Sequence, residues 1–315
     1  MNFRITTLLA GLIACTHLSA ATLYVSTTGS GTSCTQMEPC PTIQMAADNA
    51  AADDTILVAA GTYVENVHLG SPVTPMTHPG VTIRGAGKNN TFVVSAGISS
   101  QRPAGVLADI VFDIWSPDVT IEKLSIQHPA GPAPGRDIGV FVSPHGTNVT
   151  IRKCDISRHR TGPVLEPTAP GSRGVMVLRA KDTEITKNTF SGNYEDHIHM
   201  PTSDAEISKN TITGATRLGI VIIQETGASD NSGNIISKNR VSNSGSDGIQ
   251  IQGDNNTVSK NSVSDSGGVD IKLCGIAAIG DCVNPFDAWA EASNNTVIKN
   301  RVDSIVDNGS ANSIH

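Results

Sequence analysis

The sequence predicts an all-β, single-domain protein folded as a parallel β-helix, a solenoid in which short strands stack coil upon coil. The first observation is an internal repeat. An apolar residue, Ser or Thr, Lys and Asn follow one another four times, and the motifs end at Asn188, Asn210, Asn239 and Asn261. These asparagines are separated by 22, 29 and 22 residues. About twenty residues per repeat is typical of solenoid coils.

Two further observations support this fold class. The same repeats carry Gly-led apolar segments at residues 219–222, 248–251 and 268–271, which indicate a second strand in each coil. The composition also fits, because the chain has 30 glycines and only 3% aromatic residues, as thin stacked rungs require. Asn tolerates left-handed backbone angles, so we expect the repeated asparagines to form a structural ladder.

The elements can be assigned in chain order. Residues 22–26 predict the first strand, and a Gly-rich turn through Cys40 follows. Residues 42–52 predict an amphipathic helix with Thr42 as its N-cap, which would cover the open end of the first coil. Strands at 54–58, 61–64 and 80–84 begin the coils, and the last rung lies at 295–300. We expect the β-helix over 22–305 and a polar, frayed tail over 306–315.

The N-terminus resembles an export signal. Residues 1–21 combine Arg4, an apolar run and small residues at the end, as in a secretory signal peptide. The alternative is a lipoprotein signal, in which Cys15 would carry a lipid. No other apolar run is long enough to span a membrane. The sequence therefore predicts a secreted or periplasmic protein.

Charge and cysteines narrow the possibilities further. Removal of Arg4 changes the net charge from −7 to −8, which argues against a diffuse nucleic-acid surface. In an oxidising compartment, Cys34 with Cys40 and Cys274 with Cys282 are predicted to form disulfides. Cys154 occupies the position of the ladder asparagines, and we expect a buried thiol there. We expect a monomer.

A family resemblance rests on three segments: Leu-Tyr-Val-Ser at 23–26 before the Cys-containing turn, Asp-Thr-Ile-Leu-Val-Ala-Ala-Gly-Thr-Tyr at 54–63, and the Ile-x-Lys-Asn coils. Together they resemble the pectate-lyase-like right-handed β-helix proteins, and most of all the carbohydrate-directed periplasmic β-helix-repeat group. The resemblance implies right-handed coiling and covers most of residues 22–305. It does not imply one activity, because the scaffold carries lyases, hydrolases, epimerases and non-catalytic proteins. The catalytic motifs of pectate lyases, alginate epimerases and polygalacturonases are missing from this sequence, so none of their residue roles is transferred.

Strand alternation predicts which residues face outward. If Ile198, Ile220, Ile249 and Val269 point inward, then one outward column holds His199, Val221, Gln250 and Asp270. The column two residues earlier holds His197 among glycines, and the column two residues later holds Gln252 and Lys272. Polar groups therefore gather at two places on one sheet. Ordinary surface histidines and a solvated Asp270–Lys272 ion pair remain the alternative interpretation.

The chemistry of uronate cleavage suggests roles for these groups. Elimination removes a proton next to a carboxylate, so the site needs a base and a cation that neutralises the carboxylate. We predict His197, His199 and Lys272 as catalytic candidates, Asp196 and Asp270 as ligands for a possible Ca²⁺ ion, and Arg179, Arg217, Gln250 and Gln252 as substrate-binding residues. Five arginines fall in or near the turns beside this sheet: Arg158, Arg160, Arg173, Arg179 and Arg217.

These features lead to two functional expectations. The first is an exported protein that binds a polysaccharide and cleaves uronate-containing chains by β-elimination. The alternative is a non-catalytic carbohydrate-binding or cell-surface scaffold protein, which the missing family motifs favour. An assay for unsaturated sugar ends would separate the two.

Overall fold

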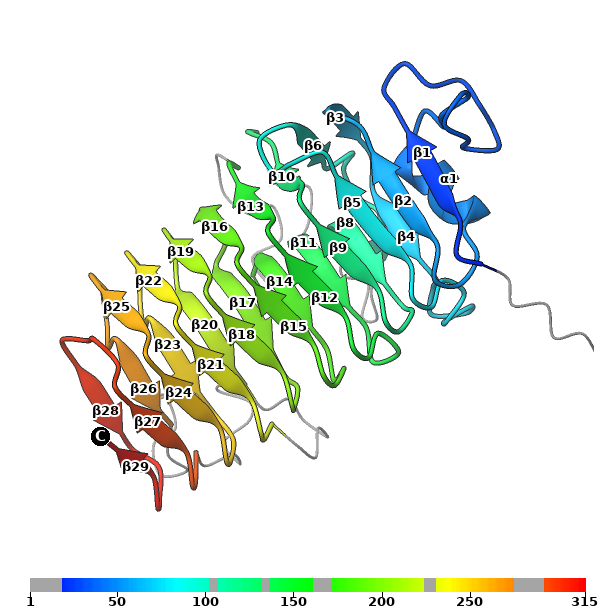
Figure 1. The fold of residues 1–315 in the computed structure, drawn as a ribbon. Helices are drawn as coiled ribbons and strands as arrows, with labels where there is room; N and C mark the ends of the chain where they lie inside the picture. The colour runs from blue at the N-terminus through cyan, green and yellow to red at the C-terminus, as the bar shows by residue number, and fades with distance from the viewer. Residues whose placement is uncertain (1–18, 102–106, 132–135, 161–170, 224–230, 275–291) are drawn as a thin grey trace, which may run out of the picture.

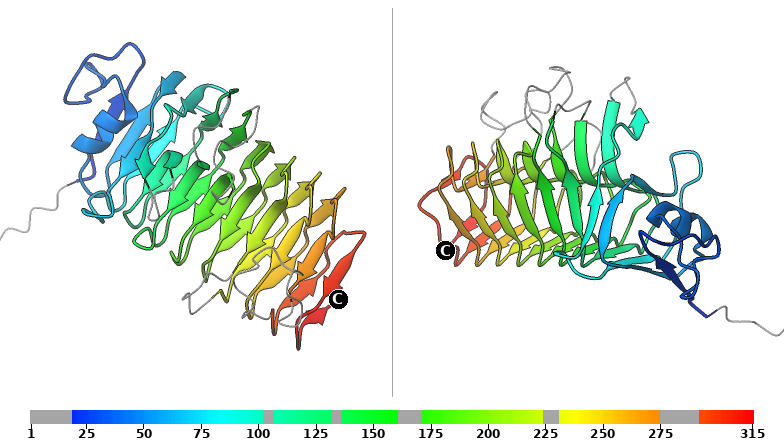
Figure 2. Two further views of the ribbon diagram at one scale, coloured as in Figure 1. Left: turned by 180° about the vertical axis from the view of Figure 1, so that it is seen from behind. Right: turned by 90° about the horizontal axis from the view of Figure 1, so that it is seen from above.

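A computed structural model describes residues 19–101, 107–131, 136–160, 171–223, 231–274 and 292–315. The chain winds into an elongated solenoid whose walls are three sheets, A, B and C (Figures 1 and 2). In each regular coil the chain passes from sheet A to B to C, and neighbouring coils pair as parallel strands. The short strand β7 (Ser100–Gln101) instead pairs antiparallel with β8. The all-β, parallel β-helix prediction is confirmed.

Sheet A begins each coil and contains short strands that mostly follow a Thr-Ile or Glu-Ile pattern. Their central apolar residues point inward; for example, Ile151, Ile185, Ile207 and Ile236 lie opposite one another in successive coils. Each of these side chains is fully buried, and such burial stabilises a fold by roughly 1.5–3 kcal/mol per side chain. The strands in this sheet are β1 (Thr22–Val25), β2 (Thr55–Val58), β5 (Thr82–Gly85), β9 (Thr120–Glu122), β12 (Thr150–Arg152), β15 (Glu184–Thr186), β18 (Glu206–Ser208), β21 (Ile235–Ser237), β24 (Thr257–Ser259), β27 (Thr296–Ile298) and β29 (Ser313–Ile314).

Sheets B and C complete each coil. Sheet B holds β3 (Gly61–Val64), β6 (Thr91–Val94), β10 (Ser125–His128), β13 (Asp155–Arg158), β16 (Thr189–Gly192), β19 (Thr211–Thr213), β22 (Arg240–Ser242) and β25 (Ser262–Ser264). Sheet C holds β4 (Val67–Leu69), β8 (Leu107–Ile114), β11 (Arg136–Val142), β14 (Arg173–Val177), β17 (Asp196–Met200), β20 (Leu218–Ile222), β23 (Ile249–Ile251), β26 (Ile271–Leu273) and β28 (Ile305–Asp307).

Helix α1 (Ile43–Asn49) covers the N-terminal end of the solenoid, as predicted (Figure 1). The Thr42 hydroxyl accepts the N–H of Met45, and the Glu65 carboxylate accepts the N–H groups of Ile43 and Gln44. The buried face of the helix consists of Ile43, Ala46 and Ala47. Ala50 is already extended, so the helix ends a few residues before the predicted position 52.

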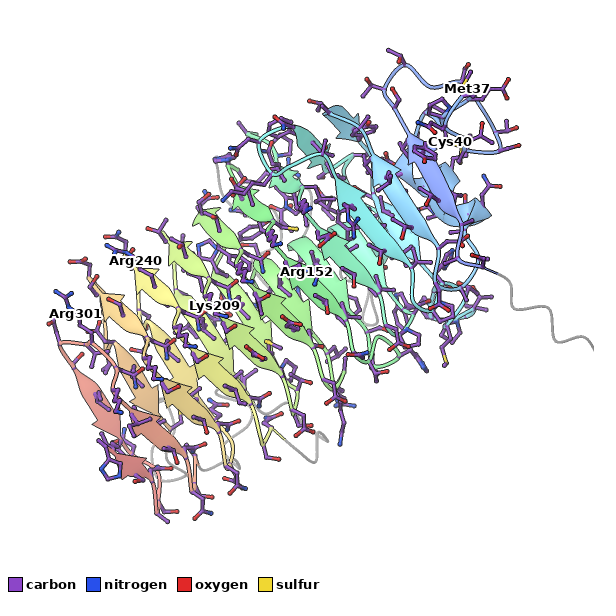
Figure 3. All side chains as sticks on the ribbon, viewed as in Figure 1. Met37, Cys40, Arg152, Lys209, Arg240 and Arg301 are labelled. Carbon is purple, nitrogen blue, oxygen red and sulfur yellow. A yellow bond between two sulfur atoms is a disulfide. The ribbon has the colours of Figure 1, made fainter. Side chains whose placement is uncertain are left out.

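The Cys-containing turn protects the free edge of the first strand. Cys34 and Cys40 form the predicted disulfide, at the end of the molecule where Figure 3 labels Cys40. The N–H of Tyr24 donates to the Cys34 carbonyl, and the Cys40 N–H donates to the Tyr24 carbonyl. Because these groups are already bonded, this edge of β1 does not offer a template for another strand.

A ladder of buried asparagines joins the later coils, as predicted. From Asn210 onward, each Oδ1 accepts two N–H groups from the Asn of the preceding coil, and each Nδ2 donates to a backbone carbonyl. The predicted ladder is Asn188, Asn210, Asn239, Asn261 and Asn300. A second ladder at the start of sheet A consists of Asn234, Asn256, Asn295 and Asn312.

The ends of the chain differ in how they meet the predictions. We expected residues 306–315 to fray, but strands β28 and β29 extend the solenoid into this segment. Asn312 holds the segment in place, because it continues the second ladder. Residues 1–18, including Cys15, lie outside the described residues, so the signal peptide and the alternative lipid anchor stay predictions. In the described part of the chain, no helix has the length and apolar character needed to cross a membrane.

We predict that Asn239→Ala lowers the free energy of unfolding by at least about 2 kcal/mol, because it leaves the Asn210 N–H and the Ile207 carbonyl buried without partners. Urea unfolding followed by circular dichroism measures the change. Asn89→Ala, at an exposed position, is the control and should change stability by less than about 0.5 kcal/mol. Equal effects of the two substitutions would contradict a stabilising ladder.

Candidate functional site

The outer face of sheet C carries the candidate site, but strict alternation fails at one position in its strands. This position is a glycine within β11, β14 and β20, and a glycine directly before β23. The glycine faces inward, since a Cβ at Gly174 would lie 3.1 Å from Phe190 and one at Gly219 would lie 2.5 Å from Val241. The next residue, such as Val175, also belongs to the core. Two successive residues therefore face the interior, and the strand pairing skips the first of them.

His197 occupies this inward position in β17. Its ring lies 5.9 Å from that of Phe190 and 5.8 Å from that of Tyr194, measured between ring centroids. Nε2 donates to the Thr213 carbonyl at 3.0 Å, whereas Nδ1 is buried without a hydrogen-bond partner. Burial lowers the pKa of His197 to about 4. The structure therefore places His197 inside the core and away from the outer face where we expected it.

The outward column that contains His199 differs from the predicted one in its last member, where the strand pairing is shifted by two residues. Ile271, and not Val269, pairs with Ile249, so Lys272 lies opposite Gln250. The Asp270 carboxylate instead accepts the backbone N–H of Asp303 at 2.7 Å, a structural role in the last turn. In order along the solenoid, the column is His68, Asp113, Phe141, Met176, His199, Val221, Gln250 and Lys272.

This register separates the predicted catalytic residues. Lys272 lies three strands from His199, which corresponds to about 14 Å along the sheet. A base and its partner must approach within hydrogen-bonding distance of the same reacting atoms. His199 and Lys272 therefore do not form one catalytic pair.

His199 belongs instead to a compact group of five residues, Arg173, Glu195, Asp196, His199 and Arg217, which we call the outer cluster. Asp196 lies at its centre with no exposed surface. Arg217 donates from Nε to Asp196 Oδ1 at 2.9 Å and from a terminal nitrogen to Oδ2 at 2.6 Å. Arg173 Nε lies 3.2 Å from Oδ2, and His199 Nδ1 lies 3.0 Å from the same atom. Glu195 pairs with Arg217 at 3.1 Å.

The electrostatics of the outer cluster keep His199 neutral. Burial and the charge of Arg173 lower the pKa of His199 to about 4, and the hydrogen bond to Asp196 opposes this shift only in part. A carboxylate only accepts hydrogen bonds, so Nδ1 carries the proton and the lone pair lies on Nε2. No described residue bonds to Nε2. The outer cluster therefore presents a neutral imidazole held by an aspartate, which is the arrangement of a general base.

Asp196 is not available as a metal ligand in this arrangement. Burial alone would raise its pKa, but Arg173, His199 and Arg217 outweigh burial and hold the pKa well below its ordinary value. Three donors approach Oδ2 and one approaches Oδ1, and all of them come from cationic or imidazole groups that occupy the space around the carboxylate. The geometry supports a role in positioning His199 and does not support the predicted Ca²⁺ site at Asp196.

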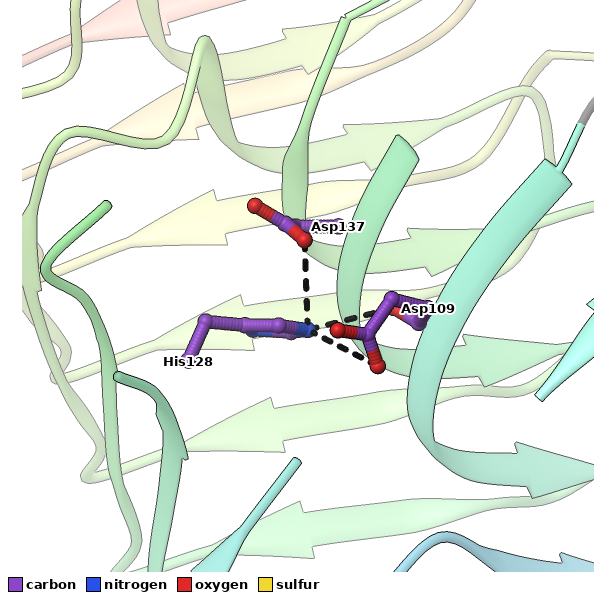
Figure 4. Close-up of side chains that lie close together, drawn as sticks. All are labelled: Asp109, His128 and Asp137. Carbon is purple, nitrogen blue, oxygen red and sulfur yellow. Dashed lines mark hydrogen bonds and ion pairs between the residues drawn. The ribbon is translucent and has the colours of Figure 1, made fainter. Parts of the chain in front are cut away.

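A second group of titratable residues lies where sheet B turns into sheet C, and we call it the corner cluster: Asp109, His128, Asp137, Arg158 and Arg160. Figure 4 shows the His128 imidazole pointing toward both carboxylates, whose nearest oxygens are 3.8 and 4.0 Å from Nε2. One ligand atom from each of Asp109, His128 and Asp137 lies within 4.8 Å of the others. All three side chains are fully buried.

The corner cluster does not fit a divalent cation. Arg158 and Arg160 each donate to one of the carboxylates at 2.7 Å, so two positive and two negative charges already balance. His128 uses Nε2 for the Asp109 carbonyl and Nδ1 for the Tyr194 hydroxyl, and burial lowers its pKa. A divalent ion would add two uncompensated charges to a buried group. Among the described residues, Asp109, His128 and Asp137 form the group of three acidic or His side chains that lie close enough together to hold an ion, and this group does not fit Ca²⁺.

The remaining predicted residues lie in varied settings. Gln250 is fully buried, and both atoms of its amide lack hydrogen-bond partners; Gln252 is also buried with an unpaired oxygen. Arg179 lies in an exposed turn beyond the end of β14. Cys274 is disulfide-bonded, and its predicted partner Cys282 lies outside the described residues. Cys154 is a buried free thiol, as predicted.

Sequence reasoning missed several members of the two clusters. Glu195, Asp109, His128 and Asp137 were not singled out, and Arg158, Arg160 and Arg173 were noted only as arginines near turns. A signal was present, since Asp109 and Asp137 precede apolar runs at equivalent positions of neighbouring coils. The gaps between coils in this region are too irregular for that equivalence to be read without the strand pairing.

We predict that Asp196→Asn lowers the free energy of unfolding by about 3–5 kcal/mol, because it leaves the buried Arg173 charge with only its longer 3.7 Å contact to Glu195. Glu195→Gln is the matched control, since Glu195 is 30% exposed and should contribute less than about 1 kcal/mol. Urea unfolding of the two variants compares them. A loss at Asp196 no larger than that at Glu195 would show that Asp196 does not hold the outer cluster together.

Protonation of His197 should weaken the fold in acid. The pKa of His197 is about 4 in the folded state and 6.5 as the ordinary value, so the stabilisation is complete above pH 6.5 and is lost as the pH falls toward 4. The full effect of one such group is about 3 kcal/mol. His197→Gln keeps a donor for the Thr213 carbonyl and should flatten the fall in stability between about pH 6.5 and 4. An unchanged pH dependence would contradict the buried, neutral histidine.

Comparisons with known proteins agree with this architecture. A family model for the right-handed β-helix region matches residues 77–231 and 138–315. No curated protein sequence matches the chain. Among solved structures, the Dettilon tailspike protein is similar with a TM-score of 0.53 and 16% identity over 78% of this chain. That alignment covers 44% of the tailspike chain, so the present chain spans less than half of its length.

Two enzymes show weaker likeness. The pectin methylesterase PemA from Erwinia chrysanthemi matches with a TM-score of 0.49 and 13% identity, over 89% of this chain and 80% of its own. An alginate lyase from a Paenibacillus species matches with a TM-score of 0.46 and 15% identity, over 90% and 99% of the two chains. At these identities the likeness concerns the fold alone. Because the family model spans well over half of the sequence and the coils have the matching architecture, the chain belongs to the right-handed β-helix family.

Proposed function

We propose that the protein is exported and binds an acidic polysaccharide on the outer face of sheet C, where it cleaves the chain by β-elimination with His199 as the base. The observation that carries this proposal is the state of His199. The imidazole is neutral, Asp196 holds its Nδ1 proton, and no described residue bonds to Nε2. Asp196 acts as a positioning residue that fixes the tautomer of the base.

The reaction needs only groups that lie together on this face. His199 Nε2 takes the proton from the carbon next to the uronate carboxylate, and that electron pair forms a carbon–carbon double bond. The glycosidic carbon–oxygen bond breaks, and the departing oxygen takes a proton from water. Arg217 is the partly exposed cation of the outer cluster, with 26% of its side chain accessible, and its contacts with Asp196 and Glu195 use three of its five N–H donors. Arg217 would therefore neutralise the substrate carboxylate.

Export is supported by the cysteines as well as by the apolar N-terminus. The Cys34–Cys40 disulfide and the disulfide at Cys274 suit an oxidising compartment. The protein would therefore meet its substrate in the periplasm or outside the cell.

A non-catalytic sugar-binding role is the second candidate, and Gln250 favours it. Its amide lies in the same outward column as His199, two strands further along, and both of its polar atoms are buried without partners. A buried amide in this state costs about 1–3 kcal/mol. Hydrogen bonds to sugar hydroxyl groups would offset this cost without any chemistry.

The two candidates are separated by incubating the protein with pectate, alginate and glycosaminoglycans, with and without Ca²⁺. β-Elimination produces unsaturated ends that absorb in the ultraviolet. Retention on an immobilised polymer without new absorbance and without new reducing ends would support binding alone.

If the protein is a lyase, His199→Ala should lower kcat by about a hundredfold or more. His68→Ala is the matched control, because His68 lies in the same outward column four strands away, and it should retain full activity. The rate of the unchanged protein should rise with pH through about 4 and then level off, because His199 must be neutral. Full activity of the His199 variant would exclude the outer cluster as the catalytic site.

A further inference from the structure

A line of lysines runs along the corner where sheet A turns into sheet B. One lysine follows the last residue of each of seven sheet A strands, from β9 to β27, and all seven have left-handed φ angles of 55–59°. They are Lys123, Lys153, Lys187, Lys209, Lys238, Lys260 and Lys299. We call them the lysine column. Six of the seven are exposed, and Lys123 is half-buried.

The lysines stack directly above one another. The backbone N–H of Lys209 donates to the Ser237 carbonyl at 3.1 Å, and that of Lys238 donates to the Ser259 carbonyl at 3.0 Å, so each lysine is tied to the residue before the next one. The spacing is therefore that of the coils, and the seven residues extend over about 29 Å.

Backbone geometry alone does not account for lysine at these positions. At the other end of sheet A, the residue two before each strand from β2 to β27 has the same left-handed conformation, and there it is Asp, Asn or Gly, the residues that adopt this conformation most readily. Examples are Asp182, Asp204 and Asn255. The left-handed conformation is therefore required at both ends of these strands, yet the left-handed residue is a lysine at only one of the two ends.

The lysine column concentrates positive charge on a protein whose net charge is negative. The chain has ten lysines and a net charge of −7, and seven of the ten lie in the column. Arg240 and Arg301, both exposed, follow Lys238 and Lys299 by two residues and lie near the same edge, as Figure 3 shows with Lys209. Within the described chain, no carboxylate forms an ion pair with a lysine of the column. Like charges at coil spacing repel one another, and an extended anion would relieve that repulsion.

The neighbouring side chains indicate which kind of anion fits. Accessible hydroxyl-bearing residues border the column at Ser237 and Ser259 in sheet A and at Thr189, Thr211 and Ser262 in sheet B, whereas Thr186 and Ser208 of sheet A are buried. Such hydroxyls can hydrogen-bond to sugar hydroxyls. Binding of single-stranded nucleic acid typically uses aromatic stacking platforms, and these bordering positions hold none. Membrane insertion would need an apolar flank, whereas the large exposed apolar residues of sheet A are two isolated ones, Ile235 and Ile314.

We propose that the lysine column is a second polysaccharide site, which binds an acidic polysaccharide lengthwise along the solenoid. One ammonium group per coil meets a polymer that carries one carboxylate per sugar unit, and the bordering hydroxyls contact the sugar. Lysine suits this task because its compact charge on a flexible stem follows a polymer without demanding one geometry. The column lies at the corner between sheets A and B, and sheet C is the third wall of the solenoid, so the column anchors the polymer independently of catalysis at His199.

The test compares three variants for binding to immobilised polygalacturonate and alginate. Replacing Lys209, Lys238 and Lys260 together by Gln should weaken binding at least tenfold, and replacing the same three by Arg should preserve it. The matched control is the combination Asn243→Asp, Asn255→Asp and Asn294→Asp, which lowers the net charge by the same amount at exposed left-handed positions elsewhere and should leave binding close to that of the unchanged protein. Circular dichroism of each variant confirms the fold.

Two further measurements distinguish binding by the lysine column from the proposed lyase activity at His199. Binding through the column should weaken steeply as NaCl rises from about 0.05 M to about 0.5 M, and His199→Ala should not change it. The Gln variant should still cleave a short oligosaccharide if the unchanged protein does.

Three results would overturn the proposal: equal binding by the Gln variant and the unchanged protein, an equal loss in the Asn→Asp control, or binding of single-stranded DNA or anionic lipid vesicles in preference to both polysaccharides.

Discussion

Parallel pairing between neighbouring coils is the constraint on which the rest of this structure depends. Each strand of a coil is bonded in register to the strand above and the strand below, so a residue at a given position in one coil lies directly over its counterpart in the next. Side chains of one kind that recur in the sequence therefore form a line along the solenoid. The Asn ladder, the apolar core and the lysine column are three lines of this kind, and each follows from one recurring position.

The candidate site arises where repetition is broken. Most coils place glycine at the inward bend of sheet C, but β17 places His197 there and fills the space between Phe190 and Tyr194. The same strand carries Asp196 and His199 on its outer face, bonded to each other across the bend. A pair three residues apart in a strand normally points to opposite faces. The extra inward residue brings both side chains to the same face, and the hydrogen bond between them depends on it.

The regular half of the molecule could be predicted from the sequence, because its repeats are nearly uniform. The fold, the capping helix with Thr42, the Asn ladder and the Cys34–Cys40 disulfide were all confirmed. The placement of His197 and Asp270 was wrong for physical reasons that a pattern of alternating residues does not contain: a bend that turns two successive residues inward, and a shift of two residues in the pairing of β26 with β23. The corner cluster was missed because charged residues far apart in sequence come together only through the stacking of irregular coils.

Cys154 stands at the first rung of the Asn ladder, where its N–H bonds to Asn188 Oδ1 and its side chain is enclosed. Burial raises the pKa of its thiol to about 12, so the thiolate that would attack a neighbouring disulfide does not form at physiological pH. An unpaired cysteine can capture the wrong partner while the disulfides of a protein form. Once the central coils have closed around the Cys154 sulfur, it cannot take part in thiol–disulfide exchange. The packing of this coil therefore protects the pairing of the other cysteines, although none of them lies in it.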